Sequence, residues 1–176
     1  TGWNFTAANL TLSCASSTIT LTGGGALFTG AGGTYGTVIF SAAIQQEITD
    51  SNTFGTLTRT GTAAKTNEFR LRANQTVTGT LNLNGNSAIN RMLVRSDTLG
   101  TARTITNSGA IMSWSNVDFR DITLGTAFDA SAITGNSGDC LGNTNITFTT
   151  AATQTASGTA SFTWSTHGWT SRVPLC

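Results

Sequence analysis

Short strands are the main element that the hydrophobic pattern of this chain predicts. Apolar residues alternate with polar ones over a few positions, and a glycine or an asparagine then interrupts the alternation. Glu and Lys, which favour helices, are sparse, and no window keeps an apolar 3.6-residue period over three turns. Thr, which suits a pleated strand, is abundant. The sequence therefore predicts an all-β protein.

One strand pattern recurs at a fixed interval. Residues 56–61 read T-L-T-R-T-G, residues 80–85 read T-L-N-L-N-G, and residues 104–109 read T-I-T-N-S-G, so the two intervals between their starts are equal. Residues 18–23, T-I-T-L-T-G, fit the same template one longer interval upstream. The template of Thr, aliphatic, small polar, variable, small polar and Gly describes a strand that turns at its glycine.

A second strand pattern recurs with nearly the same period. Residues 69–72, 92–95 and 117–120 each hold an apolar residue, a variable residue, a second apolar residue and an arginine, at spacings of 23 and 25. A period of roughly 20–25 residues suits one coil of three short strands, and such a coil buries its apolar side chains only by stacking on its neighbours. We therefore predict a right-handed parallel β-solenoid with rungs of about 24 residues.

Alternation along each strand assigns the side chains of both patterns to the interior or to the surface. The side chains of the second pattern that we predict to point inward are Phe69, Leu71, Met92, Val94, Val117 and Phe119. Leu57, Leu81 and Ile105 are predicted to form an inward aliphatic ladder on the first pattern. Arg72, Arg95 and Arg120 are predicted to point outward as a ladder of charges.

The period becomes irregular towards both ends of the chain. Residues 24–36 are rich in glycine and look like an excursion from the coil, and after Leu124 the strands continue without the regular spacing. We predict one domain, with solenoid rungs over residues 1–135 and an irregular β cap, or the start of a following layer, over residues 136–176. An antiparallel β-sandwich or jelly roll is the alternative fold, because it also has short Thr-rich strands separated by turns.

Composition and charge narrow the class of protein. Of the 176 residues only 10% are charged, and the formal net charge is +1. Nucleic-acid binding is not expected, since it needs a basic surface that releases counterions. Membrane insertion is not expected, because no apolar run approaches the roughly 18 residues that a spanning helix needs. The chain begins at Thr1 rather than Met and ends on Cys176, so we expect it to be part of a longer protein.

Three cysteines leave the redox state of the chain open. Cys14 and Cys140 would lie about five rungs apart, roughly 25 Å at ~4.8 Å per rung, whereas a disulfide needs Cα atoms within ~7 Å. A Cys14–Cys140 bond therefore conflicts with the solenoid. A Cys140–Cys176 bond and free buried thiols both agree with it, and we favour free thiols.

Candidate catalytic and metal-binding residues are few. A glycosidase needs two carboxyl groups roughly 5–10 Å apart. Asp118 and Asp97 are the pair expected to approach that arrangement, although turn and edge roles are favoured for both. The chain has one histidine, His167, and no Cys-x-x-Cys or calcium-loop motif. We therefore predict no catalytic residue, no metal site and no cofactor.

Charged and aromatic side chains supply the candidate binding residues, which are Arg72, Arg95, Arg120, Asp118, Trp164 and Trp169. Stacked guanidinium groups repel one another, so the ladder needs an offset from nearby aspartates (Asp97, Asp118 and Asp121), another subunit or an anionic ligand such as an acidic glycan. Salt bridges to the aspartates are favoured. The two tryptophans flank His167, and they either stack on a sugar or cover the open end of the solenoid, with the second role favoured.

One part of the chain resembles a known family. Within residues 53–122 the chain reads T-G-T-L-N-L-N-G-N and then S-W-S-N-V-D-F-R-D-I, and the second segment is similar to rungs of the pectate-lyase-like right-handed parallel β-helix. Thr-, Asn- and Gly-rich solenoids of this kind are common in bacteriophage tail fibres, tailspikes and other virion appendages. The resemblance implies a rigid rod, often a homotrimer, that contacts a host-surface glycan and sometimes cleaves it.

The resemblance also implies what a catalytic site would need. The lyase branch of the family uses Asp ligands for Ca²⁺ together with an Arg base. Only the arginine ladder and Asp118 or Asp121 match that pattern here, and the clustered aspartates are missing.

We therefore expect a non-enzymatic structural or receptor-binding segment of an extracellular or virion appendage, such as a phage tail fibre. Its expected location is the virion or the outside of a cell. The expected partners are a host-surface glycan, further copies of the chain in a trimer, and other virion proteins. The alternatives are a polysaccharide-degrading enzyme of the tailspike type, either a lyase or a glycoside hydrolase, and a repeat of a secreted bacterial adhesin.

Overall fold

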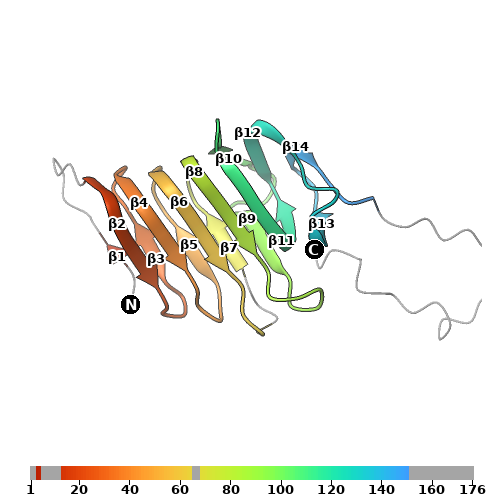
Figure 1. Ribbon diagram of the computed structural model, residues 1–176, viewed down its shortest axis with the longest axis horizontal. Coiled ribbons are helices and arrows are strands. Elements are labelled where there is room, and N and C mark those ends of the chain that lie inside the picture. Colours follow the sequence, from red (N-terminus) through yellow and green to blue (C-terminus); the bar gives the residue numbers. More distant parts are fainter. Residues whose placement is uncertain (1–2, 5–12, 65–67, 151–176) are drawn as a thin grey trace, which may run out of the picture.

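Parallel strands are the only regular secondary structure among the described residues. The computed structural model describes residues 3–4, 13–64 and 68–150. Its 14 strands join in one sheet in which every pair is parallel (Figure 1). The described residues contain no helix, and so none that is long and apolar enough to cross a membrane. The prediction of an all-β parallel solenoid is confirmed, and the antiparallel alternative is wrong.

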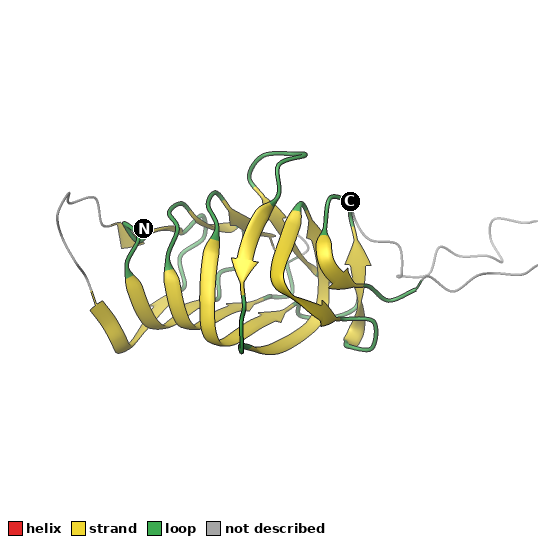
Figure 2. Ribbon diagram, turned by 90° about the horizontal axis from the view of Figure 1, so that it is seen from above, coloured by secondary structure: helices red, strands yellow, loops and turns green. Residues whose placement is uncertain are grey.

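The strands are short and follow one another closely along the chain. In chain order they are β1 (Trp3–Asn4), β2 (Ser13–Leu21), β3 (Leu27–Thr29), β4 (Thr34–Phe40), β5 (Gln46–Ile48), β6 (Thr53–Thr60), β7 (Glu68–Leu71), β8 (Gln75–Asn84), β9 (Met92–Ser96), β10 (Arg103–Thr106), β11 (Ile111–Arg120), β12 (Ile122–Asp129), β13 (Thr134–Asp139) and β14 (Thr144–Thr147). They wind into about five stacked turns, which Figure 2 shows from above.

Three faces surround the interior of the solenoid. The hydroxyl face consists of the later halves of β2, β4, β6 and β8 with Ile111–Ser115 of β11. The charged face consists of β1, β3, β5, β7, β9, the rest of β11 and β13. The third face consists of the first residues of β2, β4, β6 and β8, followed by β10, β12 and β14.

Stacked glycines let the long strands bend from the third face to the hydroxyl face. A Cβ atom added to Gly55 would lie 2.8 Å from the carbonyl oxygen of Gly36, and one added to Gly79 would lie 2.5 Å from the carbonyl oxygen of Gly55. No side chain fits between backbones at these distances, so this corner needs glycine at positions 55 and 79. The signal is present in the sequence as T-Y-G-T at residues 34–37 and T-F-G-T at residues 53–56.

The first strand pattern stacks as predicted over two of its three copies. Thr56 pairs with Thr80 and Leu57 with Leu81 in parallel register. The third copy does not continue the stack, because Ile105 pairs with Gln75 on the third face and Met112 is the residue opposite Leu81. The prediction that Ile105 extends the Leu57–Leu81 ladder is therefore wrong, although Ile105 is buried.

Variable corner lengths explain this error. The inward ladder of the hydroxyl face is Ile19, Val38, Leu57, Leu81 and Met112. Along the chain its first two steps are equal and short, its third is longer, and its fourth is the longest. The predicted rung length of about 24 residues matches only the interval from Leu57 to Leu81. The number of residues in a coil therefore varies along the solenoid. Residues 18–23 fit the template because they lie two short coils away from residues 56–61.

The second strand pattern supplies the opposite wall of the core. All six side chains that were predicted to point inward are buried, at 0–1% exposure. Phe69, Val94 and Phe119 stack in one column, which confirms the predicted faces. Aromatic contacts continue this core, with ring centroids 4.7 Å apart for Trp114 and Phe119.

An arginine occupies one interior position. The column Leu21, Phe40, Arg59, Leu83 and Trp114 is apolar except at Arg59, whose side chain is fully buried. No carboxylate among the described residues pairs with Arg59. Its guanidinium instead donates to the carbonyl oxygens of Phe40, Ala42, Ile44 and Thr60, at 2.6–3.5 Å. Burial lowers the pKa of Arg59 to about 10, so the group stays charged at neutral pH and holds the turn after β4.

The coil continues beyond residue 135. β13 pairs with β11 and β14 pairs with β12, both in parallel, which extends the stacking to Thr147. Cys140 is disulfide-bonded and Cys14 is a free thiol, so the two are not joined to each other. The preference for free thiols is correct for Cys14 and wrong for Cys140. Cys176 and the rest of the predicted cap lie outside the described residues.

The assignment of side chains on β8 leads to a stability prediction. Leu81→Ala is expected to lower the free energy of unfolding by about 2–5 kcal/mol, because it leaves a cavity in the core. Asn82→Ala is the matched control on the outward side, where the Asn82 amide donates to the Thr58 hydroxyl at 3.1 Å. Its expected cost is about 1 kcal/mol or less. Equal losses for the two variants in urea unfolding would show that the faces are wrongly assigned.

Candidate binding face

The charged face carries the arginine ladder that the sequence predicts, with one member exchanged. Its outward column runs through Glu47, Arg70, Arg95 and Arg120, because Arg70 pairs with Arg95 and Arg95 with Arg120. Arg72 lies two positions further along its strand. The prediction of Arg72 as a ladder member is therefore wrong, since residues 69–72 align with residues 94–97 rather than 92–95.

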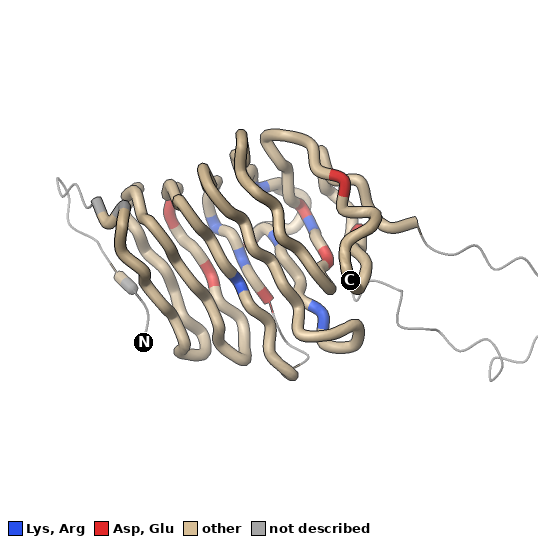
Figure 3. Tube along the Cα trace, viewed as in Figure 1, with Lys and Arg blue, Asp and Glu red and all other residues tan. Residues whose placement is uncertain are grey.

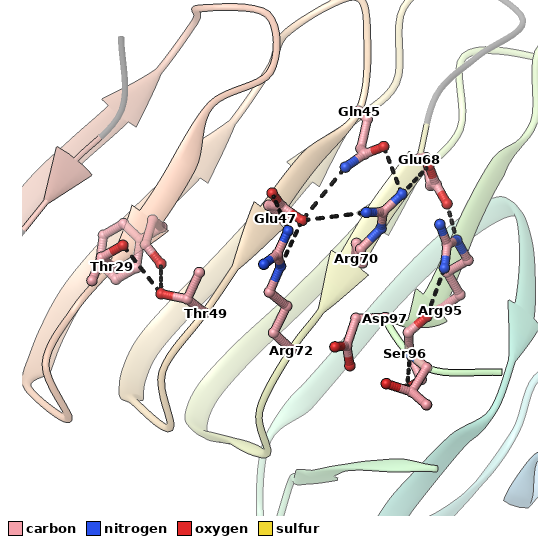
Figure 4. Close-up of polar contacts among 12 residues, drawn as sticks. Thr29, Gln45, Glu47, Thr49, Glu68, Arg70, Arg72, Arg95, Ser96 and Asp97 are labelled. Atoms are coloured by element: carbon pink, nitrogen blue, oxygen red, sulfur yellow. Dashed lines mark hydrogen bonds and ion pairs between the residues drawn. The ribbon is translucent and has the colours of Figure 1, made fainter. Parts of the chain in front are cut away.

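Glu47 neutralises the first arginines of the face. Arg72 donates through Nε and a terminal nitrogen to the two Glu47 carboxylate oxygens, at 3.0 and 3.1 Å. Arg70 lies 3.6 Å from Glu47 and donates to the Gln45 side-chain oxygen at 2.8 Å. Figure 4 shows these side chains converging from β5, β7 and the residues next to these two strands. Glu47 therefore serves two guanidinium groups on the neighbouring coil.

Arg95 takes a different carboxylate. Its Nε donates to Glu68, which belongs to the preceding coil, and a terminal nitrogen donates to the Ser96 carbonyl at 2.9 Å (Figure 4). Burial and the positive charge of Arg120 lower the pKa of Arg95, while Asp97 and Glu47 act in the opposite direction. The like-charge repulsion predicted for the ladder is thus present between Arg95 and Arg120.

Arg120 has the weakest compensation on this face. Its Nε lies 3.8 Å from an Asp121 carboxylate oxygen, which is too long for a hydrogen bond. The same Asp121 oxygen accepts from the backbone N–H of Gly100 at 3.0 Å. The Arg120 Nε atom is buried and has no hydrogen-bond partner among the described residues.

Two aspartates, Asp97 and Asp118, neutralise arginines outside the ladder. Asp118 accepts two hydrogen bonds from Arg91, at 2.6 and 2.8 Å, and both side chains are buried, at 3% and 9% exposure. Asp97 accepts two from Arg103, at 2.7 and 3.0 Å. The expected local salt bridges exist. However, the carboxylates that pair with Arg70 and Arg95 are those of Glu47 and Glu68, while Asp97 and Asp118 pair with Arg103 and Arg91.

Asp97 and Asp118 do not form a catalytic pair. Leu93 is the residue opposite Asp118, so the register places the two aspartates four positions apart along the strand direction. That offset is about 13 Å at ~3.3 Å per residue, and it exceeds the roughly 5–10 Å of a glycosidase pair. Each carboxylate also has its own arginine. Among the described residues, no three His, Cys, Asp or Glu side chains lie together in a way that could hold a metal ion.

Several residues of this face were not singled out from the sequence. Arg91 precedes the second strand pattern directly, and Glu68 does the same one coil earlier. The interval from Glu47 to Arg70 equals the interval between the first two copies of that pattern. The repeat could therefore have predicted that Glu47 lies beside Arg70 on the neighbouring coil. Trp164, Trp169 and His167 lie outside the described residues, and their binding or capping role stays a prediction.

Loss of the buried ion pair is expected to be costly. Arg91→Met leaves the Asp118 carboxylate buried without its partner and should lower the free energy of unfolding by about 3–5 kcal/mol. Arg72→Met is the control at a half-exposed position, where the loss should be about 1 kcal/mol or less. Urea unfolding of both variants measures the difference. Equal small losses would contradict a structural role for the Arg91–Asp118 pair.

The Asp97–Arg103 pair should make stability depend on pH. Partial burial alone would raise the pKa of Asp97, but hydrogen bonds from Arg103 and Thr98 and the Arg103 charge hold it below its ordinary value. A carboxyl with a lowered folded-state pKa adds stability that is present above its unfolded pKa and is lost as the pH falls through the folded one. Asp97→Asn should therefore cost about 1 kcal/mol or less near pH 7 and less than that near pH 2.

Unfolding free energies of the wild type and of Asp97→Asn at the two pH values provide the measurement. The gap between the two proteins should narrow on acidification. A gap that is unchanged at low pH would show that the carboxylate charge is not the source of the stability.

Comparison with known proteins leaves the geometry as the basis for assigning a function. No protein-family model matches the chain, and no curated protein or solved structure matches it either. The resemblance to pectate-lyase-like helices and the structure agree on the parallel β-solenoid. This agreement concerns the fold alone, and a relationship to that family or to phage tail fibres is a proposal.

Proposed function

We propose that the chain is a structural or receptor-binding segment of an extracellular or virion appendage, such as a phage tail fibre, and that it has no catalytic activity of its own. Each coil pairs its strands with those of the next coil, so the body extends along one axis and repeats similar side chains along its sides (Figure 1). A body of this kind acts as a stiff spacer that presents an extended surface. These features support the proposal at the level of architecture.

The main support for the proposal is that every carboxylate side chain has a structural partner within the protein. The chain has 8 acidic residues, all within the described part. Glu47, Glu68, Asp97 and Asp118 bind arginines. Asp50, Asp121, Asp129 and Asp139 accept hydrogen bonds from backbone N–H groups. Carboxylates used in this way hold the coils and turns together, which favours a structural role over polysaccharide cleavage by a general acid and a nucleophile.

The hydroxyl face supports assembly with further copies of the chain or with other appendage proteins. β2, β4 and β8 contain no charged residue, and the single one in β6, Arg59, points inward. Figure 3 shows most charged positions on other strands. Outward side chains here are mainly hydroxyls and amides, and they bond between coils, as Ser115 does to Asn84 at 3.0 Å. Such a face can pack against a neighbour without burying unpaired charge.

An activity measurement tests the proposal. The chain should release neither reducing ends nor unsaturated uronates from a panel of acidic and neutral polysaccharides. Asp97→Asn is the matched variant, because Asp97 is partly exposed and its replacement is compatible with folding. Asp118→Asn would not discriminate, since it disturbs a buried ion pair. Release by the wild type that Asp97→Asn abolishes would overturn the proposal in favour of a polysaccharide-degrading enzyme.

A further inference from the structure

Two guanidinium groups on the charged face are stacked, and only one of them, that of Arg95, has a carboxylate within hydrogen-bond distance. Arg95 and Arg120 are direct partners in the parallel register of β9 and β11. Their backbones are therefore about 4.8 Å apart. Both side chains are partly accessible, at 14% and 25% exposure. Like charges that face each other across adjacent strands destabilise a sheet unless another group offsets them.

The hydrogen-bond donors of this pair are largely unused within the described structure. Arg95 donates through Nε to Glu68 and through one terminal nitrogen to the Ser96 carbonyl, which leaves its other terminal nitrogen without a bond. The Arg120 guanidinium makes no hydrogen bond to a described residue, and the Asp121 carboxylate oxygen lies 3.8 Å from its Nε. Terminal nitrogens of both side chains therefore have hydrogen-bond donors that no described residue uses.

The surrounding carboxylates are already engaged. Asp97 accepts hydrogen bonds from Arg103, and Asp118 accepts hydrogen bonds from Arg91. Asp121 accepts from the Gly100 N–H. Arg95 shares Glu68 with Arg70, and Arg120 has only the 3.8 Å contact with Asp121. The two stacked guanidinium groups therefore have less anionic compensation than Arg91, which takes two hydrogen-bonded oxygens of Asp118. Such a site suits one anionic group on an otherwise neutral or weakly charged molecule, whereas a polyanion such as nucleic acid needs a continuous basic surface.

We infer that Arg95 and Arg120 together form a binding site for a tetrahedral oxyanion, the sulfate ester or phosphate group of a surface glycan. A planar carboxylate matches the fork of a single guanidinium. A tetrahedral group presents oxygens in several directions and can accept from two guanidiniums on successive coils at once. This inference rests on the proposed receptor-binding function and names the chemistry of its ligand.

The test is binding of defined probes to the intact chain by isothermal titration calorimetry at low salt. The probes are a sulfated disaccharide, a sugar phosphate, a uronate disaccharide and a neutral disaccharide. Sulfate or phosphate is expected to bind about tenfold more tightly than the uronate, and both to weaken as salt rises. The comparison of the sulfated and phosphorylated probes distinguishes the two sources of the oxyanion.

Arg120→Gln is the decisive variant, because its guanidinium makes no hydrogen bond within the described structure and its removal relieves repulsion. It should bind the favoured oxyanion at least about tenfold more weakly. Arg103→Gln is the matched control, because the Arg103 guanidinium already donates two hydrogen bonds to Asp97. This variant should bind the same oxyanion with an affinity within about twofold of the wild type. An increase in melting temperature with the favoured probe, seen for the wild type and absent for Arg120→Gln, gives a second readout.

Two results would overturn the inference. One is the absence of oxyanion binding by the wild type at low salt, and the other is equal binding by the wild type and Arg120→Gln. In either case, retention of the wild type on a neutral surface glycan without cleavage would leave the receptor-binding proposal standing. Polysaccharide cleavage would remove that proposal while leaving the oxyanion site to be judged by the binding data.

Discussion

Stacking in parallel register is the constraint on which the rest of this structure depends. A single coil has too few residues to enclose its own apolar side chains, so its interior is completed by the coils on either side. The ladder from Ile19 to Met112 and the column of Phe69, Val94 and Phe119 are two walls of that shared interior. Close approach of Gly55 and Gly79 to the backbone of the preceding coil lets long strands bend while this stacking is maintained.

Several ion pairs among the described residues connect neighbouring coils. The Glu47–Arg72, Glu68–Arg95 and Arg91–Asp118 pairs each join residues 25 to 27 positions apart, which is close to one rung of the middle coils. Arg59 also connects coils, inside the solenoid. Its guanidinium donates hydrogen bonds to carbonyl oxygens at the end of β4 and in the turn that follows β4. Partly exposed ion pairs contribute little to overall stability. Their position between coils favours one register over its alternatives.

The candidate site was only partly predictable for a reason that lies in strand geometry. Alternation has a period of two, so a slip of two residues leaves every side chain on its predicted face. Phe69, Leu71, Met92 and Val94 were therefore assigned correctly, while the ladder received Arg72 in place of Arg70. Which carboxylate lies beside which guanidinium depends on that register.

Local patterns in the sequence determined that this chain forms short parallel strands with a defined inward face, because alternation and glycine turns act within a few residues. The hexamers at residues 56–61 and 80–85 stack where their repetition predicts. Tertiary structure decided the length of each coil, and with it the replacement of Ile105 by Met112 in the ladder. It also decided the burial of Arg59 against carbonyl groups and the stacking of Arg95 on Arg120. These outcomes depend on pairings between residues about 20 to 30 positions apart, and the corners that set those distances vary from coil to coil.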